Sequence, residues 1–241
     1  MSSESVPKVV FFLGGGLNSR IGAETIPAFA AKGYHVAYAS RSLKDGRDQE
    51  GHLQLRLDLT DPGAIPGAFD RVKETFGTTP NVVIYNGHCR NVLSDTDPLS
   101  SIDPSRIEEL NAEFSINITS ALISAKCAVT GWNERPDSRL KTFLYSGNKL
   151  PVLPLPGVLT FGIGKSSVFY MIATLDAAYG TKGYRFYFTD ERKENGVHAG
   201  ADYDGKARAE VYAELAEKKE KRPWYYTFVK SRGYKYFEHT W

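Results

Sequence analysis

KVVFFLGGGLNSRIG, residues 8–22, is the stretch that decides the fold. An apolar run ends at Leu13, three glycines follow, and a segment with helical spacing of apolar residues begins near Arg20 and ends near Lys32. Strand, glycine-rich turn and helix in this order predict the first βα unit of a parallel sheet. Glycines let a phosphate approach the backbone, and the helix N-terminus presents free N–H groups to it. The stretch therefore predicts an α/β fold whose first turn holds a pyrophosphate; the alternative is a glycine-rich turn that binds nothing.

Apolar runs alternate with helical patterns along the rest of the chain. Strands are expected at residues 34–40, 53–59, 81–85, 142–145, 185–188 and 224–229. Leucines alternate with polar residues in the second of these runs, which favours an edge position for that strand. Pro27 removes a helical N–H and is expected to kink the first helix. We expect one domain over residues 1–241, with a Rossmann-type doubly wound parallel sheet flanked by helices on both faces.

Composition argues against several classes of partner. A chain of 241 residues with 41% hydrophobic residues can bury one full α/β core. The formal net charge is only +2 and no long basic block occurs, so nucleic acid is not expected to bind. Cys89 and Cys127 have no disulfide or metal-ligand spacing, and the first apolar run is too short to span a membrane. We expect a cytoplasmic protein that acts on a small molecule and uses no metal or membrane.

The end of the second expected strand indicates which dinucleotide binds. Ser40-Arg41-Ser42 stands where an acidic residue normally accepts from the ribose hydroxyls of NAD, and Lys44 and Arg47 follow. Arg41 can pair with a 2′-phosphate, and Arg20 in the glycine turn can reach the same phosphate from the other side. NADP(H) is therefore favoured over NAD(H). The alternative is that these cations are solvated surface residues.

The motifs from Lys8 to about Val229 resemble those of the short-chain dehydrogenases/reductases. The family's T-G-x-x-x-G-x-G turn appears as Gly15-Gly16-x-x-x-Arg20-x-Gly22, with two replacements. The resemblance implies a nicotinamide-dependent oxidoreductase. The cofactor-binding positions expected from the turn and the resemblance are Gly14, Gly16, Asn18, Ser19, Arg20, Ile21, Arg41, Asp58, Leu59, Asn86, Gly87 and Lys165.

The catalytic positions of the family are only partly kept. Phe161 and Lys165, four residues apart on one helical face, stand where the family has Tyr and Lys. The resemblance implies that Lys165 holds the nicotinamide ribose and that Asn117 organises a proton-relay water. It also implies that Ser146 orients the substrate, although Asn148 is a rival for that place because its spacing to Phe161 is closer to the usual one.

Phenylalanine cannot supply the proton that carbonyl reduction requires. The candidate donors are His88, Tyr145, Ser146 and Lys165. Burial would lower the pKa of Lys165 and so make its proton easier to donate. We predict an NADP(H)-dependent oxidoreductase that reduces C=O, C=N or C=C in an apolar metabolite of small or medium size. The alternative is a degenerate member that binds NADP(H) for a non-redox isomerisation or cyclisation, or that acts as a sensor without catalysis.

Residues 190–222 resemble the substrate-binding region of the family. Phe188-Thr189-Asp190-Glu191-Arg192 replaces the Pro-Gly turn that helps to cover the nicotinamide in relatives, and a helix is expected from about Lys206. Tyr203 and Tyr212 either face the substrate or pack. The proline-rich segment 150–157 cannot form a regular helix and is expected as a stiff apolar wall over the substrate.

Two further expectations concern assembly and source. An exposed aromatic strand at Trp224-Tyr225-Tyr226 would favour a homodimer or homotetramer, although ordinary core packing explains Trp224 and Tyr226 equally well. The absence of the tyrosine together with Gly162-Ile163-Gly164-Lys165 is similar to reductase sequences of fungi and implies a fungal source.

Overall fold

The computed structural model describes residues 6–134, 137, 139–230 and 232–238. The nine strands in this part of the chain form one sheet in the order β3-β4-β2-β1-β5-β6-β7-β8-β9. All neighbours from β4 to β8 pair in parallel, and the two-residue strands β3 and β9 close the edges in antiparallel pairing. The predicted doubly wound parallel sheet is confirmed.

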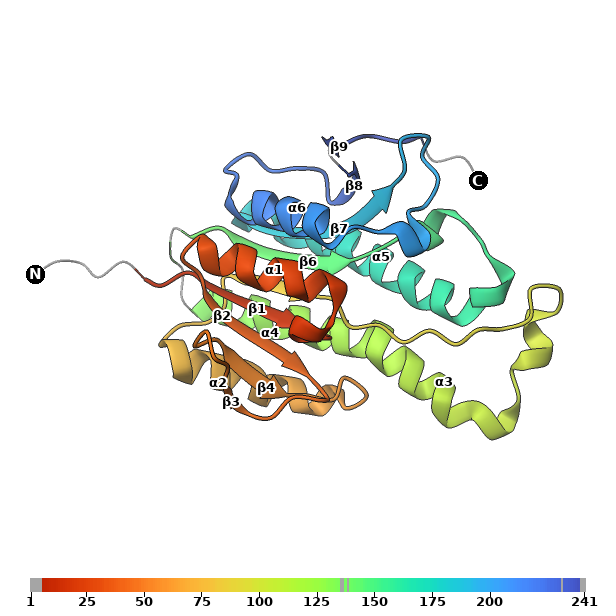
Figure 1. Cartoon of the computed structure of the whole chain (residues 1–241), viewed down its shortest axis with the longest axis horizontal. Coiled ribbons are helices and arrows are strands. Elements are labelled where there is room, and N and C mark those ends of the chain that lie inside the picture. The colour runs from red at the N-terminus through yellow and green to blue at the C-terminus, as the bar shows by residue number, and fades with distance from the viewer. Residues whose placement is uncertain (1–5, 135–136, 138, 231, 239–241) are drawn as a thin grey trace, which may run out of the picture.

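The strands are β1 (Val9–Leu13), β2 (His35–Ser40), β3 (Gly46–Arg47), β4 (Leu53–Arg56), β5 (Val82–Tyr85), β6 (Lys141–Ser146), β7 (Tyr184–Arg192), β8 (Tyr225–Val229) and β9 (Gly233–Tyr234). The helices are α1 (Arg20–Ala31), α2 (Ile65–Phe76), α3 (Ile107–Phe114), α4 (Ser120–Glu134), α5 (Leu159–Tyr179) and α6 (Gly205–Glu217). Figure 1 shows α1 and α6 in front of the sheet, while α2, α4 and α5 cover its other face.

Neighbouring strand residues belong to two different cores. Phe11 and Tyr145 pack with α2, α4 and α5, whereas Phe12 and Leu144 pack with α1 and α6. This alternation is the two-residue period of a β-strand buried on both faces. It directs the Tyr145 side chain toward α5 and the Ser146 side chain toward α6, and so divides the two hydroxyls between the two sides of the sheet.

The first helix and the expected edge strand differ from the sequence predictions. α1 runs unbroken through Pro27, which lies on its exposed side. β4 is not the edge, because β3 pairs with it in a short hairpin. Asp48 holds that hairpin, since its carboxylate accepts from the Tyr38 hydroxyl (2.9 Å) and from His52 N (2.8 Å).

β7 is longer than predicted. The sequence suggested a strand at 185–188 followed by a turn, but β7 continues to Arg192 and pairs with β8 as far as Arg192 opposite Val229. The charged residues tolerate burial in this strand because each finds an opposite charge: Asp190 pairs with Arg192 (2.7 Å) and Glu191 with Arg208 of α6 (2.9 Å).

The aromatic residues before and within β8 are not an exposed strand end. The ring of Phe169 lies 4.8 Å from those of Trp224 and Tyr225, and Tyr226 is fully buried. Their packing within the core removes the basis on which the sequence suggested self-association at this strand.

Helix α5 lies in a long apolar stretch. By length and composition, Pro156–Lys182 could cross a membrane. Val168 and Ile172 of α5 are fully buried against the sheet. A helix that packs in a core has the same composition as a membrane span, so this stretch is weak evidence for a membrane protein.

Candidate active site

The glycine turn adopts the backbone conformation that glycine favours. Gly14, Gly15 and Gly16 have φ values of +100°, +93° and +49°. A Cβ on Gly14 would lie 2.3 Å from the backbone nitrogen of Gly87, so the turn presses against the end of β5. Asn86 fixes this approach, because its Nδ2 donates to the carbonyl oxygen of Gly14 (2.9 Å). Side chains in place of these glycines would clash with the protein, so glycine is required for this close packing of the turn, a candidate pyrophosphate cradle before the N-terminus of α1.

The N-terminus of α1 packs closely against this turn. A Cβ on Gly22 would lie 1.9 Å from the carbonyl oxygen of Gly16. The Ser19 hydroxyl donates to Gly16 O (3.0 Å) and accepts from Gly22 N (2.9 Å), so it caps the helix. Asn18 is exposed and Ile21 is buried beneath the turn.

Arg20 does not point toward the end of β2, contrary to the sequence prediction. Its guanidinium donates to the carbonyl oxygens of Ala201 (3.0 Å) and Tyr203 (3.1 Å) and lies 4.6 Å from the centre of the Tyr203 ring. Carbonyl oxygens and an aromatic face are both favourable partners for a guanidinium. Arg20 therefore ties α1 to the segment before α6.

The residues that were expected to surround the adenosine lie together at the carboxyl ends of β2, β4 and β5. Asp58 is exposed, and the Thr60 backbone N–H with the nearby Arg41 guanidinium holds the pKa of its carboxyl below the usual value. Leu59 is buried under Gly87, where a Cβ would lie 2.4 Å from the Leu59 Cδ1 atom. Arg41 is exposed beside them, where a ligand can reach its guanidinium.

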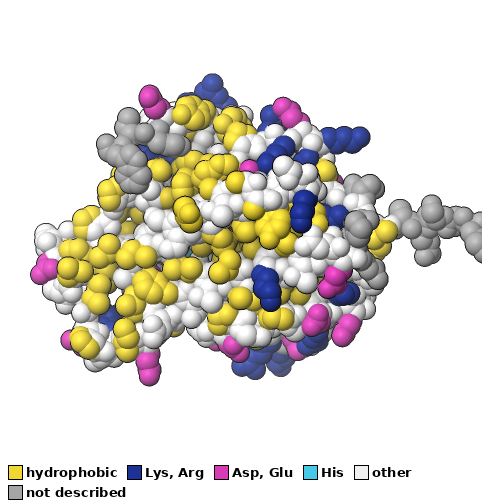
Figure 2. Space-filling model, turned by 180° about the vertical axis from the view of Figure 1, so that it is seen from behind, with side chains coloured by type: hydrophobic (Ala, Val, Ile, Leu, Met, Phe, Trp, Pro, Cys, Tyr) yellow, Lys and Arg dark blue, Asp and Glu magenta, His cyan; other side chains and the backbone are white. Residues whose placement is uncertain are grey.

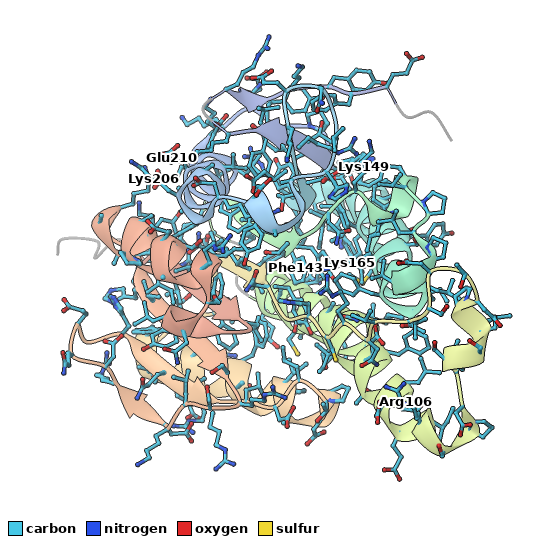
Figure 3. The ribbon with its side chains drawn as sticks, turned by 45° about the vertical axis from the view of Figure 1, so that its right-hand side comes forward. Arg106, Phe143, Lys149, Lys165, Lys206 and Glu210 are labelled. Atoms are coloured by element: carbon cyan, nitrogen blue, oxygen red, sulfur yellow. The ribbon has the colours of Figure 1, made fainter. Side chains whose placement is uncertain are left out.

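Lys165 occupies the centre of the site (Figure 3), between the central strands and α5. Its side chain is almost fully buried, and Nζ donates to the Tyr145 hydroxyl and to the Ser146 carbonyl oxygen, both at 3.1 Å. Burial, helped by the charge of Arg208, lowers the pKa of Lys165 to about 7. A lysine in this setting exchanges its proton near neutral pH.

Asn117 lies in a π-helical turn, Ser115–Thr119, between α3 and α4. Its side chain is fully buried and forms two hydrogen bonds with the backbone of Cys89. Oδ1 accepts from Cys89 N (3.0 Å), and Nδ2 donates to Cys89 O (2.7 Å). Its carbonyl oxygen accepts from the Tyr145 hydroxyl (3.4 Å). The Tyr145 hydroxyl thus lies between Lys165 and Asn117, the two residues that the resemblance joined through a water.

Two rings flank the lysine. Nζ of Lys165 lies 5.1 Å from the centre of the Phe161 ring, whose centre is 6.3 Å from that of His88. Partial desolvation, together with the charge of Lys165, lowers the pKa of His88. His88 keeps solvent contact and its Nδ1 lies 3.4 Å from Asn86 O. The structure therefore brings Phe161, Lys165 and His88 together at one edge of the sheet.

Ser146 is turned away from the lysine side chain. Its hydroxyl lies 2.7 Å from the Tyr212 hydroxyl of α6, and only its carbonyl oxygen meets Lys165. Its rival Asn148 uses its Oδ1 to accept from Leu150 N (3.0 Å) in the proline-rich segment. That segment forms two short 3₁₀ turns rather than a regular helix, as predicted.

The charged residues of β7 and α6 are the part of the site that the sequence did not indicate. Glu191 accepts from Asp204 N (2.9 Å) and pairs with Arg208, and both side chains are buried. Arg208 lies 5.5 Å from the Tyr203 ring, and Tyr212 is fully buried, so both tyrosines pack. An acid three residues after a predicted strand and an Arg in a predicted helix were the only signals. Spacing alone does not show that they meet.

No family model matches the chain. A curated protein of Cryptosporiopsis sp. (strain 8999), named short chain dehydrogenase/reductase dmxR12, is 34% identical over 233 residues, covering 94% of this chain and 93% of that protein. A solved short-chain dehydrogenase/reductase of Serratia marcescens matches with a TM-score of 0.74 and 16% identity over 92% of this chain and 96% of that one. A 4-hydroxyisoleucine dehydrogenase solved with NADH and succinate matches with a TM-score of 0.71 and 14% identity over 91% and 96%.

Proposed function

This chain belongs to the short-chain dehydrogenase/reductase family, and from that premise we propose that it is an NADP(H)-dependent oxidoreductase. It reduces C=O, C=N or C=C in an apolar metabolite of small or medium size. The observation that carries the proposal is Lys165, a buried amine at the carboxyl edge of the sheet whose pKa is lowered to about 7. Such a group can give up a proton without the missing tyrosine.

The residues of the first turn fit a nicotinamide dinucleotide. The cradle of Gly14 and Gly16 would hold the pyrophosphate at the N-terminus of α1, and Asp58, Leu59, Asn86 and Gly87 would surround the adenosine. When bound, the reduced nicotinamide supplies the hydride. The rest of the chemistry falls to the side chains of this chain.

Lys165 supplies the proton to the reduced substrate. A protonated lysine has three N–H donors, of which the hydrogen bonds to Tyr145 and Ser146 use two. The third is available to a substrate oxygen or nitrogen. The Phe161 ring covers the ammonium on one side and limits water there, which strengthens the hydrogen bond to the substrate.

The proposed preference for NADP(H) depends mainly on Arg41, because Arg20 is engaged by the segment before α6. Arg41 is exposed at the end of β2, where a carboxylate would select NAD(H). Its guanidinium can bind a 2′-phosphate through two parallel hydrogen bonds.

A fluorescence titration tests the cofactor half of this proposal. Energy transfer from the tryptophans to bound NADPH should give at least tenfold tighter binding than NADH, and Arg41→Ala should remove most of that difference. Arg47→Ala is the matched control, since Arg47 is also exposed but donates to Gly51 O (2.6 Å). Equal binding of both nucleotides to the wild type would refute the NADP(H) assignment.

A screen for NADPH oxidation with ketones, cyclic imines and enones tests the catalytic half. At least one class should be turned over, and Lys165→Met should lower the rate by about 10²-fold or more, the usual contribution of a general acid. Tight NADPH binding without turnover of any class would favour the non-redox or sensing alternative.

We further propose a cytoplasmic homodimer or homotetramer. The helices α4 and α5 leave large apolar side chains in solvent, namely Leu122, Ile163 and Tyr170. Figure 2, which views the molecule from the side of these helices, shows hydrophobic side chains gathered there with few charges among them. A patch of this kind supports self-association through this face.

A further inference from the structure

The amine of Lys165 has no carboxylate partner in the part of the chain that the structure describes. Its two acceptors, the Tyr145 hydroxyl and the Ser146 carbonyl oxygen, are uncharged. The charge that acts on it from α6 is that of Arg208, which is also positive. A buried ammonium ion without an opposite charge is unfavourable, so these surroundings favour the neutral amine.

The hydrogen bonds of Lys165 fix the direction of its lone pair. The Tyr145 hydroxyl donates its own proton to the Asn117 carbonyl oxygen (3.4 Å), so its oxygen accepts from Nζ (3.1 Å). The Ser146 carbonyl oxygen can only accept. A neutral amine has two N–H groups, and these two acceptors use both. The remaining tetrahedral position of Nζ then holds the lone pair, with no donor facing it among the described residues.

Phe161 leaves this lone pair without a neighbouring hydroxyl. Its ring centre lies 5.1 Å from Nζ and offers no donor, whereas a tyrosine on the same helical face would add one. Lys165 is 3% exposed and Phe161 8%, while Ser146 and His88 beside them are only partly buried. The amine thus lies just inside the carboxyl edge of the sheet, next to an apolar ring. This burial restricts its reactants to short, apolar molecules.

We propose that Lys165 binds small apolar aldehydes covalently, as an imine. The neutral amine attacks the carbonyl carbon, as a desolvated lysine next to another cation is suited to do. The resulting carbinolamine loses its hydroxyl group and the last nitrogen-bound proton together as one water molecule. A C=N bond replaces the C=O bond, with no oxidation or reduction. A neutral imine also avoids a positive charge beside Arg208.

His88 is placed to carry protons during this exchange. It lies close enough to Lys165 for that charge to lower its pKa further, after burial, and it keeps solvent contact. A neutral imidazole accepts a proton at one nitrogen and donates one at the other. Imine formation goes beyond the proposed reduction, because the amine here binds the aldehyde instead of protonating a reduced product.

Reductive trapping tests the imine. The protein without cofactor is treated with propanal and sodium cyanoborohydride near pH 7, digested and mapped by mass spectrometry. A propyl group should appear on the Lys165 peptide at least tenfold faster than on peptides with exposed lysines, which are protonated at this pH. Lys165→Met should remove the fast label. Lys149→Met should keep it and is the matched control, because Lys149 is also partly buried with a lowered pKa but donates to Gly196 O (2.9 Å).

A second variant guards against a fold that fails. If Lys165→Met does not fold, Lys165→Arg replaces it, since a guanidinium keeps the positive charge but forms no stable imine with an aldehyde. Equal labelling of all lysines in the wild type, no label on Lys165, or a fast label that persists in the variant overturns the proposal. The readout needs neither NADPH nor turnover, so imine formation and the proposed oxidoreductase activity can fail separately.

Discussion

At the scale of single residues, the hydroxyl group beside Lys165 does not come from position 161. Position 161 is a phenylalanine, and the hydroxyl comes from a tyrosine in β6 instead. The Phe161 ring stands beside Lys165, and the hydroxyl that meets the lysine comes from Tyr145 in β6. Tyr145 is fully buried, and burial raises its pKa well above the ordinary value, so it stays protonated. Its hydroxyl positions Lys165, and in the proposed reaction the lysine is the acid.

The titration of Lys165 predicts the pH dependence of reduction. Because its pKa is lowered to about 7, the donor loses its proton as the pH rises through that value. We expect kcat/KM for reduction to be constant below about pH 6 and to fall about tenfold per pH unit above 8. In Lys165→Met, kcat/KM should not show this fall at high pH. A rate that stays constant from pH 6 to 9 in the wild type would exclude Lys165 as the donor.

Restoring the tyrosine tests the same site from the other direction. Phe161→Tyr places a phenol on the helical face of Lys165, so carbonyl reduction above pH 8 should rise by about tenfold or more. Phe161→Leu is the control, because it changes the ring without adding a hydroxyl. If the Phe161→Tyr variant still binds NADPH but reduces no acceptor faster, the site does not place the cofactor and substrate for hydride transfer.

At the scale of elements, the approach of the glycine turn to β5 is the most exacting feature. Gly14→Ala puts a methyl group 2.3 Å from Gly87 N at a φ of +100°. We expect NADPH affinity to fall at least tenfold and the free energy of unfolding to fall by more than the roughly 1–3 kcal/mol of backbone strain. Gly33→Ala isolates the strain, since its φ is +77° and no atom lies within 4 Å. Equal effects of the two substitutions in titration and urea unfolding would show that the close approach is unimportant.

The ion pair between β7 and α6 gives a second prediction at this scale. Arg208→Met leaves Glu191 buried without its partner, so the free energy of unfolding should fall by about 3–5 kcal/mol. The double variant Glu191→Leu/Arg208→Met should recover most of this loss. Arg208 also lowers the pKa of Lys165. In both variants, the fall of kcat/KM for reduction should therefore begin at a higher pH. A double variant as unstable as the single one in urea unfolding would mean that Arg208 acts through packing.

At the scale of the whole molecule, the apolar face of α4 and α5 predicts the assembly. Tyr170 is 74% exposed near the middle of this face, and Tyr170→Asp should convert a dimer or tetramer into smaller species in sedimentation velocity. Val197→Asp is the control, because Val197 is also exposed but lies outside α4 and α5, in the segment between β7 and α6. A wild-type protein that sediments as a monomer would contradict this prediction.

Local patterns allowed much of the fold and the position of the glycine turn to be predicted. The βα alternation gave the parallel sheet, and KVVFFLGGG gave the turn at Gly14 because such glycines act through their own backbone. The pairing of Glu191 with Arg208 and the orientation of Arg20 were not accessible, because each depends on segments that meet only after folding. The length of β7 was underestimated for the same reason, since its charged residues look like a turn until their partners are known.

The segment between β7 and α6 is already held in place before any ligand arrives. Arg20 binds the backbone at Ala201 and Tyr203, and Glu191 binds both Asp204 N and Arg208. Substrate entry should therefore cost little conformational entropy, and the heat capacity change on binding should reflect apolar contact alone. For the proposed oxidoreductase, an ordered segment here would favour a narrow range of substrates and fast exchange, because no loop has to order before the substrate binds.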